Sequence, residues 1–142
     1  RRMTADQIVA AARACLGTPF RHQGRQPGAN GGIDCAGLVV HVAGALGCSY
    51  LDQEGYGTLP ANGLLEAALD AQPCLERVFD IDAKQPGDVL LMRFTGEPQH
   101  LAILAGETLI HAWEAPGLCC EHNIDATWLA RIVRVYRFVG VV

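Results

Sequence analysis

The sequence predicts an α+β fold in which helices near the N-terminus pack on a mainly antiparallel sheet. In the first half of the chain, apolar residues recur at helical spacing between capping residues and glycines. From Pro86 onward, short apolar or alternating runs of strand length are separated by turns that contain Gly and Pro. Helices followed by strands are the order typical of α+β proteins. The 142 residues show no internal repeat, so we expect one domain over residues 1–142.

The first helix is predicted to begin after Thr4, because Thr4-Ala-Asp-Gln7 is a capping box that satisfies the first free N–H groups of a helix. An apolar stripe follows, and Gly17 is expected to end the helix in a left-handed conformation. Residues 18–33 then form a glycine-containing loop that is too long for a simple connector. Loops of this kind often carry binding residues.

The second helix is predicted from Cys35 to Leu46, with Asp34 as its N-cap. It is apolar on nearly every side, so we expect it to be the buried central helix. A third, shorter helix is predicted over residues 61–71. Strands are predicted over residues 88–94, 100–105, 108–113, 118–122 and 131–138.

Composition and charge argue against several classes of function. The net charge of −4 leaves no basic patch to neutralise phosphates, so nucleic acid is not expected as a partner. No apolar run approaches the roughly 20 residues of a membrane helix, so no membrane insertion is expected. No apolar targeting segment follows Arg1-Arg-Met-Thr4, which predicts cytoplasmic synthesis without an evident signal peptide. A leader removed during maturation would leave the same start.

The six cysteines are expected to be free thiols rather than three disulfides, because a domain this large and apolar does not need covalent cross-links. No CxxC or HxxxH spacing occurs, so no structural zinc site is expected. Cys119 and Cys120 are neighbours on a predicted strand and should point to opposite faces.

Cys35 differs from the other cysteines in its position at the start of a buried helix, directly behind a glycine-rich loop. The positive end of a helix favours thiolate over thiol, and a thiolate is a nucleophile. A histidine within reach of Cys35 would indicate an enzyme rather than a binding module. The carboxylates are scattered, and no pair has a spacing that indicates glycosidase chemistry.

A predicted hairpin selects the histidine partner of Cys35. A two-residue loop at Gly106-Glu107 sets a register in which His100 and His111 are diagonal neighbours on one face. A nucleophilic cysteine needs a base and a group that orients the base, so we assign His100 as the base and His111 as the orienting residue. The reverse assignment stays open, and His122 is an alternative for the third position. His22, in the preceding loop, either lines the cleft or is an ordinary solvent-exposed residue.

Several motifs, taken in order, resemble the NlpC-type cell-wall cysteine peptidases, and the likeness covers about residues 4–138. It is greatest for the phage-encoded branch, which includes tail-assembly and virion-associated peptidases. The resemblance implies a papain-like fold in which the helix that carries the nucleophile packs on the antiparallel sheet that carries the base. The motifs are Gly17-Thr-Pro-Phe-Arg-His22, Gly32-Ile-Asp-Cys-Ala-Gly-Leu-Val39, Pro86-Gly-Asp-Val-Leu90, Gln99-His-Leu-Ala-Ile103 and Leu109-Ile-His-Ala112.

By this resemblance, Cys35 corresponds to the nucleophile, His100 to the base and His111 to the third polar residue. The implied reaction is hydrolysis of amide bonds in peptidoglycan stem peptides, often next to a γ-D-glutamyl residue. It needs neither a metal nor an organic cofactor. The backbone N–H of Cys35 is a candidate oxyanion donor.

The resemblance also implies three substrate-binding positions: Asp34, His22 and Ala36. In relatives, the aspartate helps to hold a substrate amine. His22 stands where relatives commonly have tyrosine, and Ala36 stands where they usually have serine. These departures leave Cys35, His100 and His111 in place but affect the residues that surround the substrate.

The implied substrate is peptidoglycan peptide, and phage tail proteins are expected as further partners of a virion-associated enzyme that acts at the bacterial cell wall. Two alternatives stay open. The first is a structural phage tail-assembly module with weak or no turnover, which the missing serine and tyrosine leave open. The second is a thiol acyltransferase or amidase that keeps the chemistry and acts on another substrate.

Overall fold

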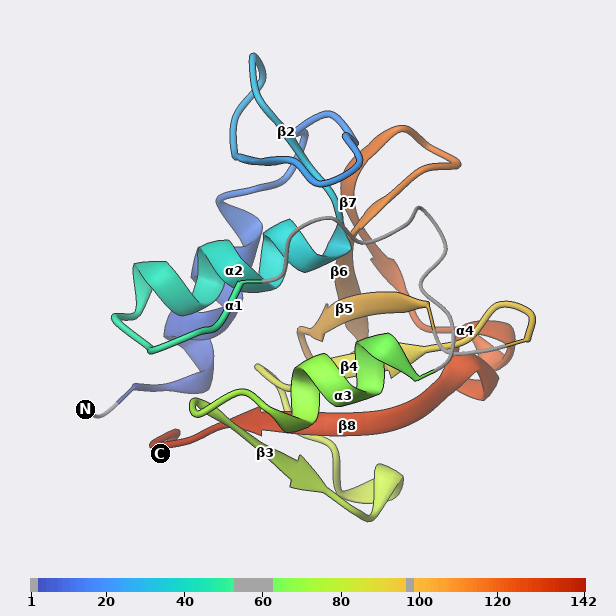
Figure 1. The fold of residues 1–142 in the computed structure, drawn as a ribbon. Coiled ribbons are helices and arrows are strands. Elements are labelled where there is room, and N and C mark those ends of the chain that lie inside the picture. Colours follow the sequence, from blue (N-terminus) through green and yellow to red (C-terminus); the bar gives the residue numbers. More distant parts are fainter. Residues whose placement is uncertain (1–2, 53–62, 97–98) are drawn as a thin grey trace.

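A six-stranded antiparallel sheet forms the centre of the fold in the computed structural model, which describes residues 3–52, 63–96 and 99–142 (Figure 1). Its strand order is β3-β8-β4-β5-β6-β7. A separate small sheet pairs β1 (Arg25–Gln26) with β2 (Gly32–Ile33). The main strands are β3 (Leu75–Val78), β4 (Val89–Met92), β5 (His100–Leu104), β6 (Thr108–Trp113), β7 (Leu118–Asn123) and β8 (Ile132–Phe138). The predicted α+β order and antiparallel pairing are confirmed.

The N-terminal helix α1 (Ala5–Arg13) has the predicted capping box. The Thr4 hydroxyl accepts a hydrogen bond from the Gln7 N–H, and the Gln7 side chain accepts one from the Thr4 N–H. The regular helix ends at Arg13, earlier than predicted, because tight turns replace it before the chain reaches Gly17. Gly17 still has the expected positive φ of 83°.

The central helix α2 (Cys35–Ala45) is buried as predicted and ends one residue before Leu46. The Asp34 carboxylate caps it by accepting a hydrogen bond from the Gly37 N–H at 2.8 Å. Helix α3 (Leu64–Asp70) is shorter than the predicted helix over 61–71, of which residues 61 and 62 lie outside the described residues. None of the helices in the described ranges has the length and apolar character of a membrane-spanning segment.

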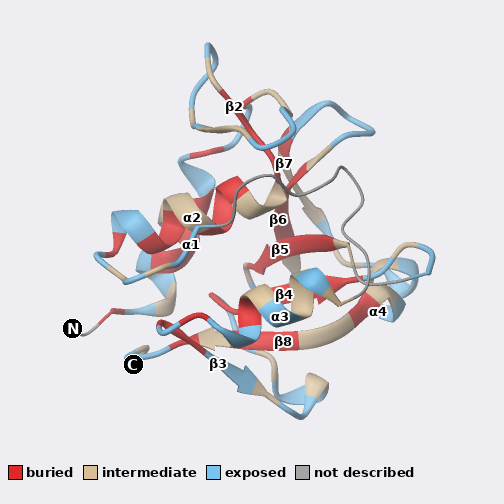
Figure 2. Cartoon of the chain, in the orientation of Figure 1, coloured by how far each residue is buried: buried red, intermediate tan, exposed pale blue. Residues whose placement is uncertain are grey.

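The two faces of the sheet carry different apolar layers, and buried residues gather on both of them (Figure 2). Because side chains alternate along a strand, Leu101 and Ile103 pack with α1 and α2, whereas Ala102 and Leu104 pack on the opposite face. Trp128 covers part of that opposite face from the short helix α4 (Ala126–Arg131). The alternation therefore puts His100 on the α4 side of the sheet.

The hairpin between β5 and β6 has the predicted register. Ile103 lies opposite Ile110 and Leu104 opposite Leu109, and the Ala105 N–H donates to the Thr108 carbonyl at 2.8 Å. Gly106 has a φ of 96°, which supplies the positive angle that this two-residue turn needs. The expectation that His100 and His111 are diagonal neighbours rests on this register, and it is confirmed.

Several short elements were not predicted: β1, β2, β3, α4 and the 3₁₀ turn Ile81–Ala83. The last strand was predicted to begin at Arg131, but Arg131 ends α4 and the strand begins at Ile132. Asp125 starts α4 by accepting a hydrogen bond from the Trp128 N–H at 2.9 Å. The elements that were not predicted have six residues or fewer, and β1, β2 and the 3₁₀ turn have only two or three, which is too short for a periodic pattern.

The six cysteines all lie in the described residues, and none of them forms a disulfide. Cys119 is buried in the layer beneath the helices, while Cys120 points to the other side of β7 and is half-buried. The predicted opposite orientation of the two side chains is confirmed.

Candidate active site

Cys35 is the first residue of α2, as predicted, and its thiol lies against the beginning of β5. Hydrogen bonding from the backbone of Leu101 and of Ala36 lowers the pKa of the thiol. Such a bond requires an N–H that donates to sulfur, so the sulfur lies one residue along the chain from His100. The hydrogen bonds among the described residues do not include one between Cys35 Sγ and the His100 ring.

The resting state of Cys35 differs from the predicted thiolate. Cys35 is half-buried, and the pKa of its thiol is raised to about 12, first because the surrounding protein desolvates the charged form and next because the Asp34 carboxylate is close. The backbone groups and the positive charge of Arg25 lower the pKa, but they do not compensate for burial. Cys35 is therefore a neutral thiol at neutral pH, and a base must remove its proton during attack.

His100 and His111 form the predicted pair on neighbouring strands. His100 Nε2 and His111 Nδ1 are 2.5 Å apart, and the two ring planes meet at 74°. Both residues are buried, with exposed fractions of 6% and 0%. Because His100 Nε2 is engaged with His111, Nδ1 is the ring nitrogen left for Cys35.

His122 extends this pair on the far side of His111. His111 Nε2 and His122 Nε2 are 2.9 Å apart, and His122 Nδ1 lies 2.9 Å from the backbone carbonyl oxygen of Asn123. His111 therefore lies between the rings of His100 and His122. The residue predicted to orient the base, His111, and its alternative, His122, both belong to one series of rings.

Aromatic side chains surround the histidines. Trp128 contacts the rings of His111 and His122, with centroid distances of 5.1 and 4.7 Å, and Phe94 lies 5.2 Å from the ring of His100. The Arg131 guanidinium stacks on Trp128 at 4.4 Å. These groups give the histidines a fixed and largely dry environment.

That environment keeps the two inner rings neutral. Burial, and then the charge of Arg131, lower the pKa of His100 to about 3. Burial, and then His100 and His122, lower the pKa of His111 to about 2. A neutral imidazole has one donor and one acceptor nitrogen, so each ring can accept a proton on one side only.

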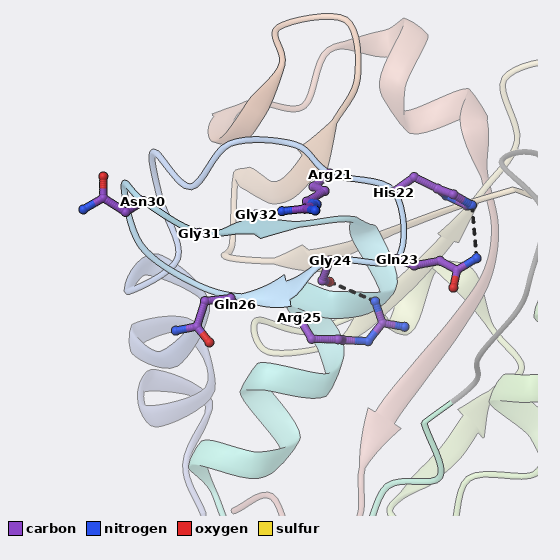
Figure 3. Close-up of a pocket in the computed structure, with 9 residues that line it drawn as sticks. All are labelled: Arg21, His22, Gln23, Gly24, Arg25, Gln26, Asn30, Gly31 and Gly32. Carbon is purple, nitrogen blue, oxygen red and sulfur yellow. Dashed lines mark hydrogen bonds between the residues drawn. The ribbon is translucent and has the colours of Figure 1, made fainter.

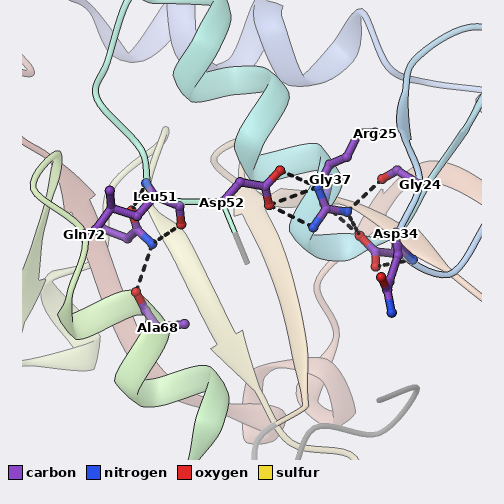
Figure 4. A network of polar contacts seen from close by, with 9 residues as sticks. Gly24, Arg25, Asp34, Gly37, Leu51, Asp52, Ala68 and Gln72 are labelled. Atoms are coloured by element: carbon purple, nitrogen blue, oxygen red, sulfur yellow. Dashed lines mark hydrogen bonds and ion pairs between the residues drawn. The ribbon is translucent and has the colours of Figure 1, made fainter. Parts of the chain in front are cut away.

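Asp34, predicted to bind a substrate amine, belongs to a polar network at the start of α2 (Figure 4). Its carboxylate is 3.0 Å from the Arg25 guanidinium and accepts a hydrogen bond from the Gln23 N–H at 2.9 Å. Arg25 also forms an ion pair with Asp52 at 3.0 Å. In this structure Asp34 thus ties the loop before β1 to the helix that carries Cys35.

Gly37 allows the loop to approach the first turn of α2 closely. A Cβ at this position would overlap the carbonyl oxygen of Gly24, which also accepts a hydrogen bond from Arg25. Only glycine fits this contact without moving the backbone. The small residue therefore holds the loop close to Cys35.

His22 is exposed in this loop, and its ring lies 3.3 Å from the Gln23 side chain. Both residues line a polar pocket of about 450 Å³ formed by residues 21–26 and 30–32 (Figure 3). His22 is thus solvent-exposed, and the pocket that it lines does not include Cys35, so a role of His22 in the catalytic cleft stays a prediction. Ala36, the other departure from the family pattern, is half-buried against the core and does not line this pocket.

The sequence did not predict the ion pairs of Arg25 or the contact of His122 with His111. The hairpin between β6 and β7 pairs His111 with Cys120 and Leu109 with His122, which makes His122 a diagonal neighbour of His111. The four residues between these strands leave the register open, so the sequence alone did not reveal this contact. Arg25 had no local signal, because both of its carboxylate partners are distant in sequence.

No group of three or more His, Cys, Asp or Glu side chains that could hold a metal ion occurs in the described parts of the chain. The chemistry that this arrangement supports is nucleophilic attack by Cys35 with help from His100.

The structure is similar to several solved structures. An NlpC/P60 family protein from Bacillus cereus ATCC 10987 has a TM-score of 0.71 and 16% identity, with 98% of this chain and 41% of that chain covered. The NlpC/p60 domain of the peptidoglycan hydrolase SagA has a TM-score of 0.61 and 24% identity, with 94% and 97% covered. The peptidoglycan hydrolase RipB from Mycobacterium tuberculosis has a TM-score of 0.64 and 20% identity, with 95% and 64% covered.

The chain thus spans less than half of the Bacillus cereus protein but nearly all of the SagA domain. Comparison with curated proteins gives no match. A family model for the NlpC/P60 family matches residues 17–137, which include the motif around Cys35 and the strands that carry the three histidines. Because this match covers most of the sequence, the chain belongs to the NlpC/P60 family.

Proposed function

We propose that this protein is a cysteine peptidase that hydrolyses amide bonds in peptidoglycan stem peptides. The observation that supports this most strongly is the position of Cys35, whose thiol contacts the backbone next to a buried His100–His111 pair. A nucleophile, a base and a group that orients the base are the components that such a reaction needs.

The first chemical step is proton transfer from Cys35 to His100. Since burial keeps the thiol protonated and the imidazole neutral, the proton moves from Sγ to His100 Nδ1 as sulfur attacks the substrate carbonyl. The two side chains share no hydrogen bond in the substrate-free protein, and catalytic contacts of this kind often tighten only when substrate binds.

The attack forms a tetrahedral intermediate and then a thioester. Asp34 caps Gly37 and leaves the Cys35 N–H as the candidate donor to the oxyanion. His100 returns the proton to the leaving amine. The same ring then takes a proton from a water molecule that attacks the thioester, the C–S bond breaks to release the carboxylic acid product, and His100 returns this proton to the sulfur of Cys35. The cycle ends with Cys35 and His100 neutral again.

The substrate class is inferred from the family and from its relatives. SagA and RipB are named as peptidoglycan hydrolases, and both share this fold. We place the stem peptide in the region bordered by Asp34, Ala36 and His22, including bonds next to γ-D-glutamyl residues. Asp34 is the candidate group for a substrate amine, which would join the network it already forms with Arg25.

We further propose a phage or prophage setting, in which the peptidase is synthesised in the cytoplasm, assembles with tail proteins and acts at the bacterial cell wall. The support is the sequence resemblance to the phage-encoded branch. A tail-assembly module without turnover would keep the same fold, so the catalytic test below also decides between these two functions.

The test is digestion of purified muropeptides, followed by mass spectrometry of the products. We expect wild-type protein and the control Cys48→Ala to release stem-peptide fragments, and Cys35→Ala to release none. Equal digests from the wild type and Cys35→Ala would contradict the peptidase and favour a structural module. Amide products formed when an amine is added, with little hydrolysis, would instead indicate an acyltransferase.

A further inference from the structure

The three histidines form a series whose far end is a backbone carbonyl. His100 on β5, His111 on β6 and His122 on β7 lie on consecutive strands, and their rings meet edge to face or tilted. The last contact, from His122 Nδ1 to the Asn123 carbonyl oxygen, is 2.9 Å long. This arrangement determines which nitrogen of each ring carries the proton.

The carbonyl of Asn123 can only accept a hydrogen bond, so His122 Nδ1 must donate. In neutral His122, Nε2 then has only a lone pair and must accept from His111 Nε2. His111 is neutral because burial lowers its pKa, so its Nδ1 must in turn accept from His100 Nε2. Each bond sets the direction of the next.

The end of this series is the nitrogen that the proposed reaction uses. Because His100 Nε2 carries the proton and the ring is neutral, His100 Nδ1 has a lone pair and can accept the proton of Cys35. If the hydrogen bonds ran in the opposite direction, His100 Nε2 would accept from His111 and the proton of the neutral His100 ring would be on Nδ1. His100 Nδ1 could then not accept the proton of Cys35. The tautomer of His100 is therefore determined by His122, the third ring of the series.

The surroundings hold this direction in place. Trp128 packs against both His111 and His122, which restricts rotation of either ring. His111 also stacks on Trp113 with a centroid distance of 5.4 Å and an interplanar angle of 21°. With these contacts, neither ring can turn over without losing both packing and a hydrogen bond.

We propose that His122 is a positioning residue, which the Asn123 carbonyl orients and which sets the tautomers of His111 and His100 so that His100 Nδ1 is the base for Cys35. This inference rests on the proposed function, because it assigns a role within the same site. It adds a fourth side chain to the catalytic cysteine and its two histidines, and this side chain is linked to His100 through His111.

The direct test is nitrogen-15 NMR of the histidine rings in the wild-type protein. We expect His100 and His111 to be protonated at Nε2 and His122 at Nδ1. A proton on His100 Nδ1 in the wild type would overturn the proposal without any variant and without an activity measurement. An inactive wild-type protein with the expected tautomers would contradict the proposed function instead.

Two substitutions test the link to catalysis. His122→Phe keeps a ring against Trp128 but has no acceptor, so we expect mixed tautomers at His111 and His100. We expect kcat on a stem peptide to fall by about 10- to 100-fold with little change in KM, as for other groups that orient a catalytic side chain. In His122→Gln, the side-chain oxygen can still accept from His111 Nε2, so we expect kcat within about threefold of the wild type by the same reasoning.

The matched control is His41→Gln, which removes a half-buried histidine of α2 outside the series and should change neither tautomers nor kcat. Unchanged tautomers and kcat in His122→Phe would overturn the proposal. If His122→Phe does not fold, loss of kcat in a folded His122→Gln whose His100 keeps the wild-type tautomer would contradict it.

Discussion

Two polar regions of opposite character lie on either side of Cys35. On one side, three histidine rings are joined in series and contact aromatic side chains, and burial keeps His100 and His111 neutral. On the other side, the charged groups of Asp34, Arg25 and Asp52 form ion pairs that extend from a buried carboxylate to the surface. The ion pairs are attached to the start of α2, and the histidine series begins on β5 beside it. The two regions nevertheless hold their side chains in different ways.

The difference shows what each region can do. Hydrogen bonds between neutral rings have a direction, so they can determine where a proton sits and which nitrogen is basic. Ion pairs have little directional information about protons, but they hold the loop over residues 21–26 against α2. We therefore expect changes in the histidine series to affect rate and changes in the ion-pair network to affect stability.

The largest expected effect on rate comes from removing the base. His100→Gln should lower kcat/KM on a stem peptide by about 1,000-fold, within the range typical of lost general-base catalysis. The protein should remain folded, since glutamine can still donate toward His111. Steady-state kinetics together with a thermal melt check this. A loss of less than tenfold would mean that another group is the base, and it would contradict the assignment of rate to the histidine series.

The next effect concerns alkylation of Cys35. Because the pKa of its thiol is raised to about 12, iodoacetamide should modify Cys35 at pH 7 at least about tenfold more slowly than a free cysteine with a pKa near 8.5. The rate should increase with pH up to pH 10. Peptide mapping by mass spectrometry measures each cysteine separately. Fast alkylation at pH 7 with no increase above it would show a preformed thiolate.

On the ionic side, Asp34→Ala should lower the free energy of unfolding by about 3 kcal/mol. The substitution removes the N-cap of α2 and leaves the partly buried Arg25 without its inner partner. Asp34→Asn should cost less, because its side-chain oxygen can still cap Gly37. Urea denaturation of the three proteins gives these values. Equal costs for the two variants would mean that the charge, rather than the cap, dominates.

The neutral histidines predict a loss of stability in acid. The pKa values of His100 and His111 are about 3 and about 2 in the folded state, below the ordinary 6.5. As the pH decreases below 6.5, the unfolded chain binds protons that the folded chain does not, so the free energy of unfolding falls.

Removing one of these histidines should weaken that dependence. Between pH 6.5 and pH 5, we expect His111→Gln to have a slope that is shallower by up to about 1.4 kcal/mol per pH unit. Urea denaturation at several pH values measures both slopes. Parallel curves for the two proteins would contradict the lowered pKa, because they would show that His111 takes up its proton over the same pH range in the folded and unfolded states.

The smallest expected effect is that of Asp52→Asn. Its ion pair with Arg25 lies nearer the surface, where the Asp52 side chain is 39% exposed, and pairs of this kind contribute about 0–1 kcal/mol. We expect a change within 1 kcal/mol in urea and no change in kcat by that reasoning. A larger loss would mean that the outer ion pair is needed to hold Arg25 on Asp34.

Sequence patterns predicted the parts of this site that depend on local spacing. The cap at Asp34, the helix start at Cys35 and the hairpin that pairs His100 with His111 each involve residues within a few positions or one tight turn. Such features follow from backbone geometry, which a short segment specifies by itself. The roles of Cys35 and His100 in catalysis remain predictions for the experiments above.

The sequence by itself determined the main helices and strands, the cap of the nucleophile's helix and the register of one hairpin, because these are local. Only the tertiary structure placed His122 behind His111 and Arg25 between Asp34 and Asp52, since those contacts depend on how distant segments meet. It also decided the protonation of Cys35. A helix N-terminus lowers a thiol pKa, but the desolvation of Cys35 by the segments packed around it, which no local pattern specifies, raises it by more.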